Sequence, residues 1–124
     1  MWKTFALAAA LATVLAAPAM AQSSMCSEPI APAAVDGSTA TAAQLHAAVQ
    51  DVKTFLKQSD DYQVCLLREL DNAKDAAKKD KKDIDPAIPA AVDAKIKANQ
   101  ALKERVGAEY NTAATVYNKA HPDK

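Results

Sequence analysis

Two cysteines and two histidines carry the most versatile side-chain chemistry in this chain of 124 residues. Cys26 and Cys65 could act as nucleophiles, as metal ligands or as a disulfide pair. Neither cysteine belongs to a CxxC, CxxCH or cysteine-rich zinc motif. An oxidising compartment favours one intramolecular disulfide between them, with an intermolecular bridge or two free thiols as the alternatives. We therefore expect the cysteines to have a structural role.

The two histidines could bind a metal only if the fold brings them together. His46 and His121 are far apart in sequence, but a hairpin would place both at its open end. With Asp51 or Asp123 they could then form a weak metal site. Because their spacing is not that of a metal-ligand motif, solvated side chains are the simpler interpretation. We expect neither a bound metal nor a cofactor.

Motifs that indicate catalysis do not occur in the sequence. It contains no G-x-S-x-G, no H-E-x-x-H and no glycine-rich phosphate loop. A bond between Cys26 and Cys65 would also remove the strongest nucleophiles. We therefore expect a protein that is not an enzyme.

The composition indicates a helical protein. The chain has 30 alanines but only two glycines, and aromatic residues make up 5% of it. Alanine favours helices more than any other residue does. The 15 basic and 15 acidic side chains balance, which argues against a nucleic-acid-binding protein.

Residues 1–21 have the pattern of a cleavable signal peptide. Lys3 supplies a positive charge, an apolar run follows, and Ala19-Met20-Ala21 matches the small-x-small pattern that signal peptidase cleaves. The apolar run is shorter than the ~20 residues that a bilayer requires. We expect cleavage before Gln22, a location in the periplasm or outside the cell, and no membrane span after cleavage.

The remaining chain predicts a long antiparallel helical hairpin. Thr41 and Gln44 fit a capping box, and apolar residues then recur every three or four positions over 41–83. Asp85-Pro86 predicts the start of a second helix over 87–120. Two long helices joined by a short connection pack as antiparallel neighbours, as in a coiled coil.

Two positions inside this hairpin predict how its helices pack. With the turn centred near residue 85, the Tyr62 ring would face Gly107. A glycine inside a helix costs about 1 kcal/mol, and room for the ring would explain it, with a helix kink as the alternative. Asn99 lies on the apolar stripe and could fix the register, as buried polar residues do in coiled coils.

Residues 22–40 predict an extended arm that precedes the hairpin, because they contain Pro29, Pro32 and the turn dipeptide Asp36-Gly37. The arm can span up to ~46 Å, and the helix rises about 36 Å from Thr41 to Cys65. The arm can therefore run back along the first helix. A disulfide to Cys65 would stabilise the fold by about 4 kcal/mol in the chain-entropy model. On that flank of the helix, the residues that the arm would cover are Ala47, Thr54, Gln58 and Tyr62.

Several segments are similar to those of small exported bacterial proteins of unknown function, whose chains are mostly a helical hairpin. These segments are Cys26 with Pro29 and Pro32, Asp51-Val52-Lys53-x-Phe55, Tyr62-Gln63-x-Cys65-Leu66, Ala98-Asn99-Gln100, Lys103-Glu104, Val106-Gly107 and Tyr110-Asn111. The resemblance covers most of the chain after residue 21. It implies secretion and a hairpin, and it implies no activity, ligand or catalytic residue.

These observations favour a noncatalytic protein-binding or scaffolding role in the cell envelope. Each helix of a pair buries only one stripe, so Val64, Leu67 or Leu102 could contact a protein partner or a second copy. A periplasmic carrier of a metal or small ligand, with His46 and His121 as metal ligands, is an alternative. A holdase-type chaperone is another alternative, although no residue selects it.

Overall fold

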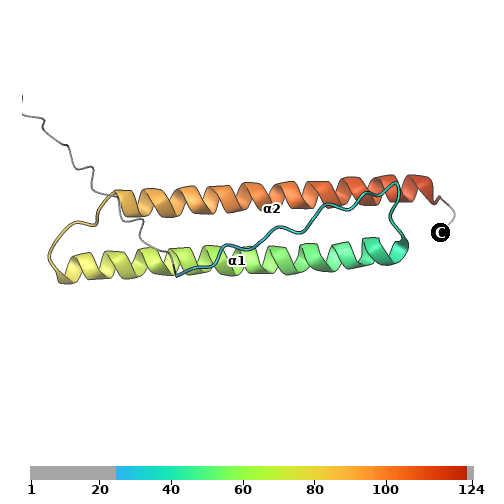
Figure 1. The fold of residues 1–124 in the computed structure, drawn as a ribbon. Helices are drawn as coiled ribbons and strands as arrows, with labels where there is room; N and C mark the ends of the chain where they lie inside the picture. Colours follow the sequence, from blue (N-terminus) through green and yellow to red (C-terminus); the bar gives the residue numbers. More distant parts are fainter. Residues whose placement is uncertain (1–24, 123–124) are drawn as a thin grey trace, which may run out of the picture.

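The computed structural model describes residues 25–122 and contains two long helices in antiparallel contact (Figure 1). Helix α1 spans Ala42–Lys79 and helix α2 spans Ala87–Ala120, with no strand in the described residues. The predicted all-α hairpin is confirmed. The expected signal peptide and Asp123 lie outside the described residues.

Helix α1 begins at the predicted capping box. The Gln44 backbone N–H donates to the Thr41 hydroxyl over 3.2 Å, and the Thr41 N–H donates to the Gln44 side-chain carbonyl over 2.8 Å. These two bonds satisfy N–H groups that the first turn of a helix leaves without backbone partners. The chain therefore changes from extended arm to helix at one defined residue.

Helix α1 ends at Lys79, earlier than the predicted residue 83. The Lys81 N–H donates to the Lys78 carbonyl and the Lys82 N–H donates to the Ala77 carbonyl. Lys81 has a φ of 52°. This is a Schellman termination, in which a residue in the left-handed region stops the helix. This ending was not predictable from the sequence, because the left-handed position is usually occupied by glycine and here it is lysine.

Helix α2 begins at Ala87 and ends at Ala120, as predicted. The Asp85 carboxylate accepts the Ala87 N–H over 2.9 Å, and Pro86 has a helical φ of −62°. Asp85 thus satisfies one free N–H of the first turn, and Pro86 has no N–H to satisfy.

The register between the helices differs from the predicted one. Tyr62 belongs to a buried cluster with Leu66 and Val92, much nearer to the start of α2 than Gly107 is. A Cβ atom built on Gly107 would have no contact within 4 Å, so the predicted packing of Tyr62 against Gly107 is wrong. Figure 1 shows the reason: α1 extends beyond the start of α2, and the connection runs back to reach it. The turn is therefore not symmetric about residue 85.

Candidate functional site

The arm crosses the helix pair from α1 to α2 (Figure 1), and residues 32–35 pack against side chains of both helices, whose surface here we call the groove. It begins on α1 at Cys26, crosses to α2 near Gly37 and returns to α1 at Thr41. Its direction, antiparallel to α1, agrees with the prediction. The predicted flank of α1 describes only its first part, where residues 27–29 lie beside Gln58 and Tyr62. Beyond that point both helices contact the arm.

A disulfide fixes the first end of the arm. Cys26 is bonded to Cys65 with a Cα–Cα distance of 5.8 Å, which confirms the predicted pairing. The Met25 N–H donates to the Glu69 carboxylate over 2.6 Å, so a hydrogen bond supports the same end. Burial raises the pKa of the nearby Tyr62 phenol, and the charges of Glu28 and Glu69 raise this pKa further.

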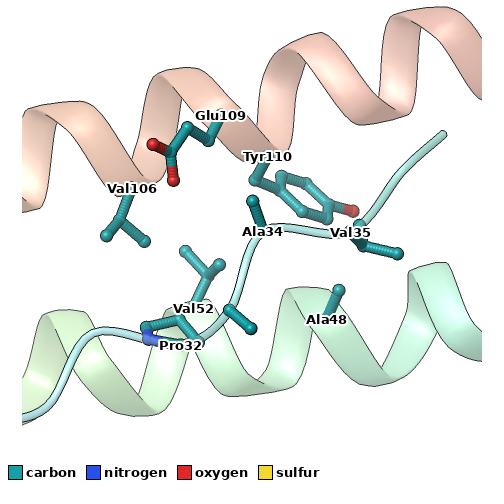
Figure 2. Close-up of a pocket in the computed structure, with 9 residues that line it drawn as sticks. Pro32, Ala34, Val35, Ala48, Val52, Val106, Glu109 and Tyr110 are labelled. Carbon is teal, nitrogen blue, oxygen red and sulfur yellow. The ribbon is translucent and has the colours of Figure 1, made fainter.

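Apolar packing holds the middle of the arm. Figure 2 shows Pro32 next to Val52 of α1, and Val35 between Ala48 of α1 and Tyr110 of α2. The free volume among the lining residues is about 20 Å³. That space holds about one water molecule, far less than a small-molecule pocket of roughly 300 Å³ or more. Around residues 32–35 the arm therefore fills the groove, and the larger hollows that residues 27–29 and 34–37 line are open to solvent.

A close approach of two backbones fixes the far end of the arm. Gly37 is buried, and a Cβ atom built on it would lie 2.0 Å from the carbonyl oxygen of Ala113 in α2. No side chain fits at that distance without a shift of the backbone. The sequence identified Gly37 only as part of a turn and assigned tight packing to Gly107. The structure assigns that role to Gly37.

A compact turn connects Gly37 to the start of α1. The Asp36 carboxylate accepts the N–H and the hydroxyl of Ser38, over 2.9 and 2.7 Å. The Asp36 carbonyl accepts the N–H groups of Thr39 and Ala40. The bonds from Ser38 lower the pKa of Asp36 below its ordinary value. The turn therefore sets the angle between the arm and the first turn of α1.

A polar layer crosses the helix pair beside this groove. Ser59 and Asn99 are fully buried, and the Asn99 amide donates to the Ser59 hydroxyl over 3.3 Å. The Gln63 amide donates to the Asn99 side-chain carbonyl over 2.8 Å. In addition, Lys103 forms an ion pair with Asp60. These cross-helix bonds support the predicted role of Asn99 in fixing the register.

The two histidines do not form a metal site with other described residues. His46 is exposed, and His121 stacks on the Tyr117 ring with its Nδ1 3.0 Å from the Tyr117 carbonyl oxygen. Within residues 25–122, only Cys26, Cys65 and Glu69 bring three metal-type ligand atoms together. Because the two sulfur atoms are bonded to each other, that group offers no thiolates while the disulfide is intact.

Two apolar side chains of α1 are only half covered. Val64 is 54% exposed and Leu67 is 49% exposed, whereas Leu102 is partly buried. At 100° per residue, Val64 and Leu67 point away from Cys65 and hence from the start of the arm. Neither described helix has a stretch apolar enough to cross a membrane.

No protein-family model, curated protein or solved structure shows significant similarity to this chain. Its function therefore has to be inferred from the filled groove, the polar layer and the exposed side chains.

Proposed function

We propose that this chain is an exported, noncatalytic protein that binds or organises other proteins in the cell envelope. The observation that carries the proposal is the exposure of Val64 and Leu67, which are the two most exposed large apolar side chains of the described helices. Full burial of a side chain of this size contributes roughly 1.5–3 kcal/mol, and a partner that covers the exposed half of each residue would gain about half of that at each position.

The surroundings of this pair suit a protein partner. Asp60 lies one helical turn before Val64 and forms an ion pair with Lys103 of α2. Gln100 lies close by, within 3.5 Å of the Gln63 amide. An apolar centre with charged and amide groups at its edge is the usual composition of a protein–protein contact.

Export is the second part of the proposal. The signal-type pattern of residues 1–21 supports it, as does the Cys26–Cys65 bond, because disulfides persist mainly in oxidising compartments. The resemblance to small exported hairpin proteins points in the same direction. Mass spectrometry of the protein from fractionated bacteria tests this part. We expect a periplasmic or secreted chain that begins at Gln22, and a full-length cytoplasmic chain would contradict it.

Photo-crosslinking in living cells tests the binding role. We expect a photoreactive amino acid at Leu67 to give one discrete adduct, identified by mass spectrometry, and Val64→Lys to remove it. The same amino acid at the exposed position Gln50 serves as the control and should give no such adduct. Equal labelling at Leu67 and Gln50, or an adduct that persists in Val64→Lys, would contradict the proposal.

A further inference from the structure

We propose that the groove also accepts the arm of a second copy, so that two chains exchange arms and form disulfides between Cys26 of each and Cys65 of the other. This surface is separate from Val64 and Leu67, so the two proposals can fail independently. The groove defines its occupant: it fits an extended segment with a proline, a valine and a glycine at fixed spacings. A second copy carries that same segment.

The arm is held in a way that permits exchange. Among the described residues, the stretch 27–35 makes no hydrogen bond to either helix, and side-chain packing holds its middle part against them. An arm from another chain would make the same contacts to Val52, Val106 and Tyr110. Exchange therefore keeps the groove contacts and changes only which chain supplies them.

The turn at residues 36–40 is the hinge of this exchange. Opening it breaks the bonds that Asp36 accepts from Ser38, Thr39 and Ala40. Gly37 stays seated against Ala113 of the other chain, so the four steps from Gly37 to Thr41 can extend to roughly 14 Å at most. The open ends of two hairpins would therefore lie within that distance of each other in the exchanged dimer.

The disulfide decides whether exchange can occur. While Cys26 is bonded to Cys65 in its own chain, the start of the arm cannot transfer to another chain. Before this bond has formed, each thiol can pair within its own chain or with a thiol of another chain. Each new bond forms when two thiols give two protons and two electrons to a disulfide oxidant such as glutathione disulfide, which leaves as two glutathione thiols.

Two single-cysteine variants test the exchange directly. Cys65→Ser keeps Cys26 on its arm, and Cys26→Ser keeps Cys65 beside its groove. We mix the two reduced chains, distinguished by a tag, and oxidise them with glutathione disulfide. Seating of one arm in the other groove should favour the mixed disulfide over either homodimer by about tenfold, because it raises the local thiol concentration.

The two glycines supply matched controls. Gly37→Ala, placed in the Cys65→Ser chain, should lower the yield of the mixed dimer by about tenfold, because its Cβ would collide with the Ala113 carbonyl. Gly107→Ala in the same chain should leave the yield unchanged, since its Cβ would meet no atom within 4 Å apart from its chain neighbours and the backbone of its own helix. Circular dichroism verifies that both variants keep the hairpin.

A statistical mixture of dimers, or a mixed dimer that is insensitive to Gly37→Ala, would overturn the exchange. If the Leu67 adduct still forms in cells, the proposed binding role survives that result. If instead the mixed dimer forms as expected and the Leu67 adduct does not, arm exchange stands and the contact at Val64 and Leu67 is wrong.

Discussion

The contact between α1 and α2 and the contact between the arm and the helices use different chemistry. The helices are joined by a buried hydrogen-bonded layer that includes Ser59 and Asn99. The arm is joined by a covalent bond at Cys26, by apolar packing, and by a backbone approach at Gly37. Hydrogen bonds are directional and select one register, which two long alanine-rich helices need. The arm is short and covalently tied at Cys26, so it needs only a matching shape in the groove and no directional bonds to set its register.

Removal of the Cys26–Cys65 disulfide should give the largest change in the free energy of unfolding. We expect Cys65→Ser to lower the free energy of unfolding by about 4 kcal/mol, because the unfolded chain is then no longer closed into a loop of about 39 residues. Urea denaturation followed by circular dichroism measures the change. The helical signal of the folded state should persist, since the capping box and the polar layer remain. An unchanged midpoint would show that the disulfide contributes nothing to stability.

Removing the centre of the polar layer should have the next largest effect. We expect Asn99→Ala to lower the free energy of unfolding by about 2–3 kcal/mol, because Ser59 and Gln63 each lose a buried partner. The exposed Asn72→Ala serves as the control and should change stability by less than about 0.5 kcal/mol. Urea denaturation measures the free energy of unfolding of both variants. An equal loss in the two would mean that the polar layer does not stabilise the contact between the helices.

The layer can also be replaced rather than broken. The double variant Ser59→Ala with Asn99→Leu should recover most of the stability lost in Asn99→Ala, but it should no longer select one register. Doubled amide signals in an NMR spectrum would reveal the second register. A single set of sharp signals would mean that apolar packing alone fixes the alignment.

The two glycines should respond in opposite directions. We expect Gly37→Ala to lower the free energy of unfolding by about 2 kcal/mol, because the new methyl group forces the arm away from Ala113. Gly107→Ala should instead raise it by about 1 kcal/mol, because alanine is the better helix former and the site is open. Thermal denaturation shows whether each variant is more or less stable than the original protein. A loss of stability in Gly107→Ala would contradict the open surroundings of Gly107.

The smallest expected effect concerns pH. The pKa of Tyr62 is raised by burial under the arm, so the folded state holds this proton more tightly than the unfolded chain does. The resulting stability is fully present below the ordinary tyrosine pKa of about 10 and is lost as the pH rises through the folded pKa. Tyr62→Phe should remove this part of the alkaline loss. Urea denaturation of both proteins below and above about pH 10 checks it, and an equal alkaline loss of stability in both would contradict it.

The sequence predicted the features that depend on neighbouring residues. The capping box at Thr41, the bounds of α2 and the stripe through Asn99 follow from local spacing and helical periodicity. The Cys26–Cys65 bond was predictable because the chain offers one intramolecular pairing, and the arm is long enough to make it.

The sequence did not predict the features that depend on how distant segments meet. Termination of α1 relies on Lys81 in a left-handed conformation, where glycine is the usual residue. The register follows from the path of the connection, which periodicity does not report. The roles of Gly37 and Gly107 could not be distinguished either, because the sequence does not show which distant residues pack against a glycine.

The position of the disulfide also has a mechanical consequence. The described chain begins over α1, well away from both ends of the rod (Figure 1). A pulling force applied at Met25 would enter the helix through the covalent bond at Cys65. It would bypass the groove contacts entirely, so the arm would not peel off under load. The load would therefore act on the hairpin at Cys65, inside α1, and not at either end of the helix pair.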